Sequence, residues 1–268
     1  QQQVTDSLHN ELATSKNASE KLESYISLAS QQKHQSPIEG KKLLTLAKAI
    51  AIQLKDTVHL FKIAEIEADI YYILGETEKE ISVIKDAILL VQQYKNKQLE
   101  ARALKLLGNA YSETSDYDKQ LNSYLKSFTI AEKLQDTTLL VSLYNNIGNV
   151  YKDLKMYKKS LENYEKGLHL HTQSSSPISK SIAGILWGNS GIVYEQLGNY
   201  KEALRRVKIA KNIRVALKNW GQIGGSNIDI ANVYEKSQQL DSAIFYNKQG
   251  VLNYKKIQNK GGLLVGYE

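Results

Sequence analysis

The sequence has no cysteine, only two prolines and no long apolar run. Without cysteine, the chain cannot form disulfide bonds, thiolate metal sites or a cysteine nucleophile. Because proline interrupts helices, two prolines in 268 residues favour long helices. No apolar run approaches the ~18 residues that a membrane-spanning helix needs, so the sequence predicts no membrane span in this segment. The hydrophobic fraction of 42% is still enough for a continuous core.

Residues that could carry catalysis or hold a metal ion are few and scattered. His169 and His171 are two positions apart, on different sides of a helix, whereas a helical metal pair needs i, i+4 spacing. The other three histidines have no organised partners in the sequence. Residues 221–226 lack the Gly-Lys-Ser/Thr ending of a phosphate-binding loop, and we expect their glycines to loosen the start of a helix. Glu65 and Asp69 are better explained as part of a solvated helix face. The sequence therefore predicts no enzyme, no cofactor and no metal site.

The chain does contain a clear helix-turn-helix pattern at residues 186–204. Its first apolar stripe has the i, i+3, i+4, i+7 spacing of one helix face and consists of Trp187, Ser190, Gly191 and Tyr194. Gly198 can adopt the left-handed conformation that ends a helix, and Asn199 can cap the next helix. Ala203 then begins the packing face of that second helix. The segment predicts two helices joined by a tight turn.

The same order of residues recurs along the chain. A small residue precedes a tyrosine by three positions at Ala68/Tyr71, Gly108/Tyr111, Gly148/Tyr151, Gly191/Tyr194 and Ala231/Tyr234. These tyrosines are 40, 40, 43 and 40 residues apart, and we expect residues 174–177 to hold the extra three. The pattern of small residue, tyrosine, glycine turn and alanine resembles the tetratricopeptide repeat (TPR). The period exceeds the ~34 residues of the standard unit, as in TPR families related to kinesin light chains and bacterial peptide-sensing regulators.

The resemblance implies an all-α fold, an α-solenoid that winds as a right-handed superhelix of about six TPR units. The expected units are about 18–55, 56–95, 96–135, 136–175, 176–219 and 220–259, with a seventh starting at 260. Residues 1–17 are predicted to be a polar lead-in or N-terminal cap, and residues 18–268 a single TPR solenoid. In the first unit, Ser36 is expected to cap a helix that begins at Pro37, with Glu39 reaching back to it.

The resemblance also implies a groove, lined by the first helix of each unit, that takes a protein or an extended peptide. The predicted ligand-binding residues are Arg102, Lys105, Asn109, Asn145, Asn149, Lys152 and Asn232. Asparagine offers a donor and an acceptor to a peptide backbone, and lysine suits a carboxylate. Asparagine after the small residue is also common in TPR units, so a purely structural role is an equal alternative. In the fifth unit Gly188 and Ile192 occupy the corresponding positions, which predicts an apolar step.

Positive charge is concentrated in one predicted helix. The chain has a net charge of +7, and residues 199–218 hold seven lysines and arginines against Glu202, a net of +6. Such a helix could attract acidic protein, lipid headgroups or nucleic acid, although a solvated outer face is the simpler interpretation. The segment has no helix-turn-helix reading element and no interleaved aromatic residues. We therefore predict no specific nucleic-acid binding.

Three functions are compatible with the sequence. The first is a non-catalytic protein- or peptide-binding scaffold. The second is the sensory region of a bacterial signalling protein, because sensor histidine kinases with exported TPR regions are similar in their 40-residue units and polar, Gln-rich starts; the kinase would lie outside these residues. The third is nucleic-acid binding through the basic helix. The start at Gln1 and the unfinished last unit favour an extracytoplasmic, periplasmic segment of a membrane-anchored protein. A cytoplasmic peptide-responsive regulator or adaptor is the alternative, and homodimerisation is compatible with each.

Overall fold

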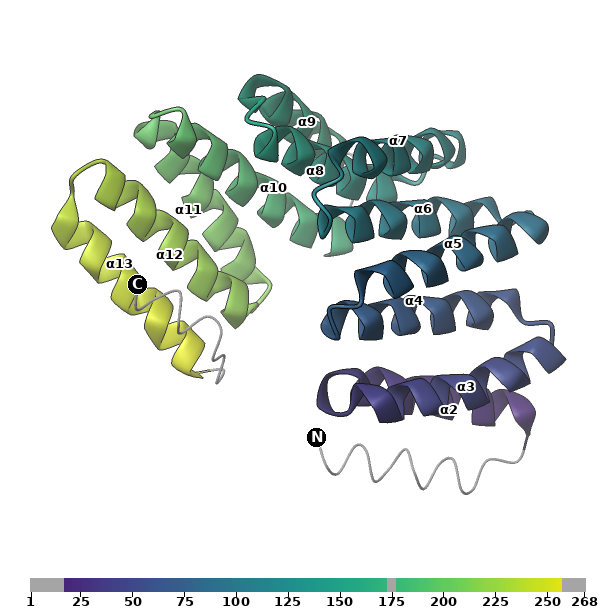
Figure 1. Ribbon diagram of the computed structural model, residues 1–268. Coiled ribbons are helices and arrows are strands. Elements are labelled where there is room, and N and C mark those ends of the chain that lie inside the picture. Colours follow the sequence, from purple (N-terminus) through teal and green to yellow (C-terminus); the bar gives the residue numbers. More distant parts are fainter. Residues whose placement is uncertain (1–16, 173–176, 257–268) are drawn as a thin grey trace. The chain divides into compact units, whose positions relative to one another are not determined.

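The computed structural model describes residues 17–172 and 177–256, which form twelve α-helices and no strand (Figure 1). The predicted all-α fold is confirmed. The helices are α2 (Ala18–Gln35), α3 (Pro37–Gln53), α4 (Thr57–Ile73), α5 (Thr77–Gln93), α6 (Lys97–Ser112), α7 (Tyr117–Leu134), α8 (Thr137–Asp153), α9 (Tyr157–His171), α10 (Pro177–Gln196), α11 (Tyr200–Ala216), α12 (Trp220–Lys236) and α13 (Leu240–Lys256). The predicted lead-in up to residue 16 and the predicted seventh unit at residue 260 lie outside the described residues.

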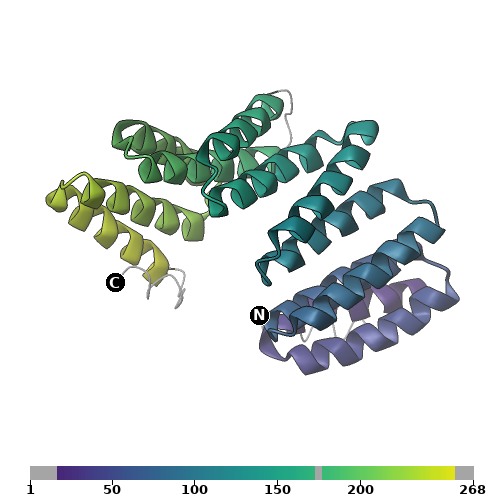
Figure 2. The same cartoon turned by 45° about the horizontal axis from the view of Figure 1, so that its top comes forward.

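Consecutive helices form six helix-turn-helix pairs, from α2 with α3 to α12 with α13. The predicted number of about six units is confirmed. The chain divides into two compact units, Gln1–Leu134 and Gln135–Glu268, which we call unit 1 and unit 2. Unit 1 contains α2 to α7 and unit 2 contains α8 to α13 (Figures 1 and 2). Whether one solenoid runs through both, as the sequence predicts, stays a prediction.

Within each unit the first helices of successive pairs lie next to one another. In unit 1, α4 contacts both α2 and α6, and in unit 2, α10 contacts both α8 and α12. Each pair also packs against the next, because the second helix of one pair contacts the first helix of the following pair within the unit. Each unit therefore has one side formed by its first helices and another formed by its second helices.

Except at Ser36 between α2 and α3, where φ is −145°, every tight turn between described helices places one residue in the left-handed region. These residues are Lys55, Gly75, Lys95, Ser115, Gln135, Lys155, Gly198, Lys218 and Gln238, with φ between 53° and 74°. Gly198 has φ of 74°, as predicted, and Asn199 caps α11 by accepting a 3.2 Å hydrogen bond from the N–H of Glu202. Most of the other positions hold lysine, serine or glutamine. The backbone hydrogen bonds that close the turn, such as Asn199 N–H to the carbonyl of Tyr194 at 2.9 Å, hold this conformation.

Ser36 is the N-cap residue of α3 and Pro37 occupies its first turn, both as predicted, but the side chain of Ser36 makes no capping hydrogen bond. Ser36 is also the last residue of the turn that ends α2, where its N–H donates to the carbonyl of Gln32 at 2.8 Å. One residue joins the two helices, so its backbone conformation is set by both. Glu39 lies 3.2 Å from Lys42 in an ion pair on the same helix.

The small residues of the repeat lie at helix crossings, as predicted. A Cβ atom added at Gly108 would overlap the ring of Tyr124, and one at Gly148 would overlap the ring of Tyr164. Gly191 faces Val207 in the same way, and Ala231 is buried. The missing side chain lets the two helices of a pair approach closely enough for a large side chain to fill the gap between them.

The glycines of residues 221–226 do not loosen a helix start, contrary to prediction. They lie inside α12. Gly224 faces the ring of Tyr254 on α13, and a Cβ atom added at Gly224 would crowd that ring. Gly250 on α13 faces Ile228 in return. Close packing in the last pair therefore depends on glycine from both helices.

Gly148→Leu should destabilise the protein by about 1–3 kcal/mol, because the new side chain must displace the buried ring of Tyr164. Denaturant-induced unfolding measures the change. Lys166→Leu, at an exposed position of α9, adds the same side chain and should change stability by less than about 0.5 kcal/mol. Equal unfolding free energies for Gly148→Leu and the wild type would contradict the proposed crossing.

Lys155→Gly should stabilise the protein by about 1 kcal/mol, because Lys155 has φ of 58° and glycine alone adopts that conformation without strain. Thermal unfolding followed by circular dichroism measures the change. The matched control is Lys166→Gly inside α9, where the same substitution should cost about 1 kcal/mol. Two changes of the same sign would show that the turn is not strained.

Candidate functional site

The first-helix side of unit 1 is held together by ion pairs. Lys33 on α2 lies 2.6 Å from Asp69 on α4. Arg102 on α6 donates to both carboxylate oxygens of Glu65 on α4, at 2.9 and 3.0 Å, and its guanidinium lies 5.4 Å from the ring centre of Phe61. Arg102, predicted to bind a ligand, is therefore paired with a carboxylate on the neighbouring helix.

The charge of Lys105, the second predicted cation of α6, also acts on Glu65. Burial raises the pKa of the Glu65 carboxyl, whereas the charges of Arg102 and Lys105 lower it. The balance leaves the pKa above its usual value. Both predicted cations of α6 thus act on a partly buried carboxylate within the protein, which weakens their electrostatic attraction for the carboxylate of a ligand.

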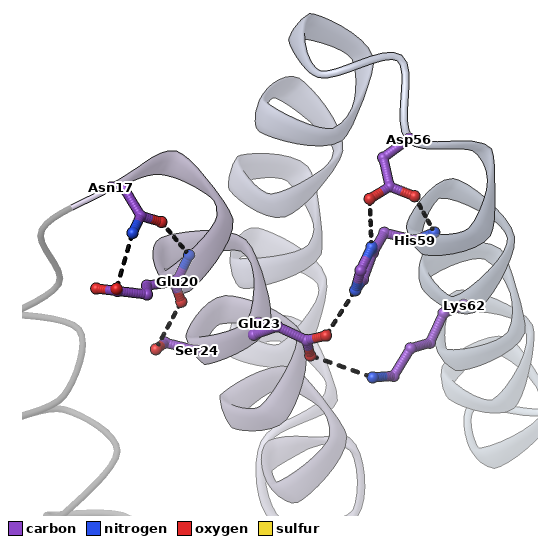
Figure 3. Close-up of polar contacts among 7 residues, drawn as sticks. All are labelled: Asn17, Glu20, Glu23, Ser24, Asp56, His59 and Lys62. Carbon is purple, nitrogen blue, oxygen red and sulfur yellow. Dashed lines mark hydrogen bonds and ion pairs between the residues drawn. The ribbon is translucent and has the colours of Figure 1, made fainter.

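His59 connects α2 to α4 through a polar network (Figure 3). Its Nε2 lies 2.6 Å from Glu23 Oε1 on α2, and its Nδ1 lies 2.6 Å from Asp56 Oδ2. Lys62 Nζ also reaches Glu23, at 3.3 Å. Burial alone would lower the pKa of His59, but the hydrogen bonds to Glu23 and Asp56 outweigh it and raise the pKa. The prediction that this histidine has no organised partners is wrong. Its partner Glu23 lies 36 positions away, and nothing in the sequence pattern indicated that the two side chains meet.

Two of the predicted asparagines accept hydrogen bonds from buried tyrosines. Tyr124 donates its hydroxyl to Asn109 Oδ1 at 2.8 Å, and Tyr164 donates to Asn149 Oδ1 at 2.7 Å. Each tyrosine ring fills a helix crossing and carries its hydroxyl to the amide oxygen. The acceptor side of both amides therefore has a structural role.

Unit 2 carries a row of asparagines across α8 and α10. Asn189 on α10 donates to Asn145 Oδ1 at 2.9 Å and to Asn149 Oδ1 at 3.1 Å, and Asn145 donates to Asn146 Oδ1 at 3.2 Å. We call Asn145, Asn149 and Asn189 the amide row. Among the described residues, neither Asn149 Nδ2 nor Asn189 Oδ1 has a protein partner, and both side chains are partly exposed. The row thus presents one donor and one acceptor at the surface.

Asn189 corrects the predicted apolar step in the fifth unit. Gly188 and Ile192 do occupy the expected helix positions, but Asn189 lies between them and reaches α8. The signal was present in the sequence, because Asn146, Asn189 and Asp229 follow one another at 43 and 40 residues, the spacing of the repeat. Aligning the units at every position, rather than at the consensus positions alone, would have found it.

A pocket of about 600 Å³ lies between α10 and α12, next to the amide row. Its lining consists of Ile192, Glu195, Gln196, Asp229, Asn232, Glu235 and Lys236. Glu195 is buried and forms a 2.5 Å ion pair with Lys236, while Glu235 is exposed. Burial raises the pKa of Asp229 to about 6, although the charge of Arg214 opposes the shift. The predicted residue Asn232 is exposed at this pocket.

The last predicted residue, Lys152, lies on α8 and forms a 3.3 Å ion pair with its neighbour Asp153. It does not line the pocket between α10 and α12.

The basic helix α11 uses its arginines within the protein. Arg205 and Arg206 both bond to Glu202, and Arg206 also pairs with Glu165 and lies over the ring of Trp187. Arg214 donates to Ser226 Oγ at 2.6 Å. The concentration of positive charge in the sequence is therefore largely explained by packing between α11 and its neighbours.

Within residues 17–172 and 177–256, no three His, Asp or Glu side chains are grouped so that they could bind a metal ion. None of the described helices combines the length and apolarity needed to cross a membrane.

Comparison with known proteins identifies the repeat. Residues 141–170, in α8 and α9, match the family model of the tetratricopeptide repeat. No curated protein matches the chain. The helix pairs and their crossings have the TPR helix-turn-helix architecture that the sequence pattern predicts, and each unit stacks its pairs as an α-solenoid does. The resemblance to sensor histidine kinases stays a prediction.

Three solved structures with the same fold are similar over nearly the whole chain. The STAND protein PH0952 from Pyrococcus horikoshii, described as having a tetratricopeptide repeat sensor, has a TM-score of 0.69 at 16% identity, over 94% of this chain and 40% of that one. The apo form of the quorum sensor NprR from B. thuringiensis has a TM-score of 0.69 at 11% identity, over 99% and 74%. A Rap protein complexed with Competence and Sporulation Factor has a TM-score of 0.68 at 12% identity, over 98% and 77%. At these identities the likeness shows the fold alone.

His59→Gln should remove a pH-dependent part of the stability. Because the folded pKa of His59 is raised, its contribution is complete below the unfolded pKa of about 6.5 and is lost as the pH rises through the folded value. The wild type should therefore be more stable than the variant at acidic pH, and the difference should shrink above neutrality. Melting temperatures across the pH range measure it. His34→Gln, at an exposed histidine on α2, is the control, and parallel curves for wild type and His59→Gln would contradict the network.

Proposed function

We propose that this chain is a non-catalytic scaffold that binds an extended peptide or protein tail on the first helices of unit 2. The observation that carries the proposal is the amide row, with an open donor at Asn149 and an open acceptor at Asn189. An extended peptide offers one N–H and one carbonyl per residue, so an amide row of this kind can bond to its backbone without selecting its side chains.

Selectivity would come from the pocket between α10 and α12. Glu195 is neutralised there by Lys236, which leaves Asp229 and Glu235 as the carboxylates facing a ligand. Ile192 supplies the apolar part of the lining. A polar or basic side chain of the bound peptide fits this balance better than an acidic one. The earlier prediction of a ligand carboxylate near Lys105 has less support, because Lys105 acts on Glu65.

The similar proteins support a regulatory role for such binding. The Rap protein is in a complex with Competence and Sporulation Factor, NprR is described as a quorum sensor, and PH0952 is described as having a TPR sensor. We therefore propose that the chain is the ligand- or partner-sensing part of a signal-transduction protein. A sensor of the histidine kinase type in the periplasm and a cytoplasmic peptide-responsive regulator are both consistent with this proposal, and fractionation of the native protein distinguishes them.

The structure gives nucleic-acid binding less support than the sequence does. The arginines of α11 bond to carboxylates and stack on aromatic rings inside the protein. Lys201 and Lys218 are the cations of this segment for which the described residues provide no partner, and two lysines offer little to a phosphate backbone.

The double variant Asn189→Ala/Asn232→Ala should bind peptides more weakly while remaining folded. On an array of short extended peptides, we expect the peptides retained by the wild type to bind the double variant about tenfold or more weakly, because two or more hydrogen bonds are lost. Affinities of the retained peptides, measured in solution by fluorescence anisotropy, give the value.

The matched control is Asn212→Ala, at an exposed asparagine on the second helix α11. It should retain wild-type affinity, and circular dichroism should show the same helicity for all three proteins. Unchanged affinity of the double variant for every retained peptide would place binding elsewhere on the chain.

A further inference from the structure

Unit 1 has a groove on its second-helix side that is distinct from the proposed peptide site. Its volume is about 780 Å³, and α5, α6 and α7 form it. Ile88, Leu104 and Leu107 form its floor, and Lys85, Leu89 and Lys126 lie on its walls. We call it the lysine groove. The walls come from α5 and α7, the second helices of successive pairs, and α6 provides most of the floor.

The floor of the lysine groove is apolar and still reachable from outside. Ile88, Leu104 and Leu107 are 8–9% exposed, which is the upper end of the protein core. Leu89, on the α5 wall, is 65% exposed. Exposing a large apolar side chain to water is unfavourable, and a partner that covered Leu89 would remove this free-energy cost. The groove is therefore suited to an inserted apolar ridge.

The walls of the groove are positively charged. Its one carboxylate, Glu100, is buried, accepts from Lys97 at 2.7 Å and from Gln92 at 2.8 Å, and is therefore neutralised by the protein itself. Lys85 and Lys126 remain, one on each wall, and both are exposed. Two cations on opposite sides of an apolar floor would bracket a partner that carries carboxylates along both edges of an apolar stripe.

The neighbouring groove in the same unit has the opposite charge. A smaller groove of about 400 Å³ lies between α3 and α5, over α4, and has a similar apolar lining that includes Ile52 and Leu60. Its charged residues are Lys48, Glu67 and Asp86, which is one cation against two carboxylates. The same architecture thus occurs twice with different charges, so the charge of the lysine groove is a property of its own residues.

We propose that the lysine groove binds an acidic amphipathic helix of a partner protein. Its lining on α5 extends from Lys85 to Gln92, which corresponds to about two helical turns. A bound helix places its apolar residues at i, i+3, i+4 and i+7 over the same length. A flat bilayer surface would not reach a floor recessed between two helices. On α13 the exposed apolar residues Ile244 and Phe245 lie on a helix with more lysines than acidic residues, so this helix of a second copy would not suit the groove.

The test uses a fluorescent helical peptide with leucines at i, i+4 and i+7 and glutamates along both edges. We expect saturable binding to the full chain that weakens with salt. Lys85→Glu/Lys126→Glu should weaken it about tenfold or more. The control Lys48→Glu/Lys166→Glu has the same net charge, with one change in the neighbouring groove and one on α9, and should bind as the wild type does. A peptide with lysines in place of the glutamates should prefer the charge-reversed variant.

Three results would overturn the proposal. One is the absence of saturable binding of the acidic peptide to the wild type. Another is an equal loss of affinity in both double variants, which would reflect net charge alone. The third is tighter binding of anionic phosphatidylglycerol vesicles than of the peptide, with the same dependence on Lys85 and Lys126, which would make the groove a lipid site.

Discussion

The close contact between a glycine on the first helix and a tyrosine on the second is the interaction on which the central helix pairs depend. At Gly148 the absent side chain lets the ring of Tyr164 lie directly against the backbone, where it is completely buried. The ring then carries its hydroxyl past the crossing to Asn149, the next residue on α8. The contact that joins the two helices therefore also orients an amide on the surface. Gly108, Tyr124 and Asn109 repeat the arrangement in unit 1.

This coupling gives the consensus asparagines Asn109 and Asn149 a structural role. The oxygen of Asn149 is occupied by Tyr164 and Asn189, which fixes the side chain and points its nitrogen outward. A binding group held in this way loses little conformational freedom when a ligand arrives. Of the two roles that the sequence left open for Asn149, the structural one belongs to the amide oxygen, and the ligand role that we propose falls to the amide nitrogen.

The sequence predicted the structural features that depend on the type of a single residue. It missed those that depend on contacts between residues far apart in the sequence. The small residue and tyrosine repeat located every described helix pair after the first, because the crossing requires a small residue. The tyrosines that fill the crossings at Gly108 and Gly148 are Tyr124 and Tyr164 on the second helices, not the tyrosines of the repeat. The left-handed turn was recognised at Gly198 but not at Lys155 or Gln238, because lysine and glutamine carry no signal for a positive φ. Likewise Arg102 was read as a ligand-binding cation, since its pairing with Glu65 joins residues 37 positions apart.

The two units differ in what they bury at the same repeat position. The packing position of the second helix holds Ser160, Ala203 and Ala243 in unit 2, but Gly40, Glu80 and Gln120 in unit 1. The two long side chains are buried, and burial, together with the charges of Glu113 and Asp69, raises the pKa of Glu80 to about 7. Small residues occupy this position in all three pairs of unit 2, whereas two of the three pairs of unit 1 hold a long polar side chain there, and unit 1 also has ion pairs on its first-helix side. With that side occupied by internal ion pairs, the apolar floor and unopposed lysines between α5 and α7 are the part of unit 1 best suited to a partner.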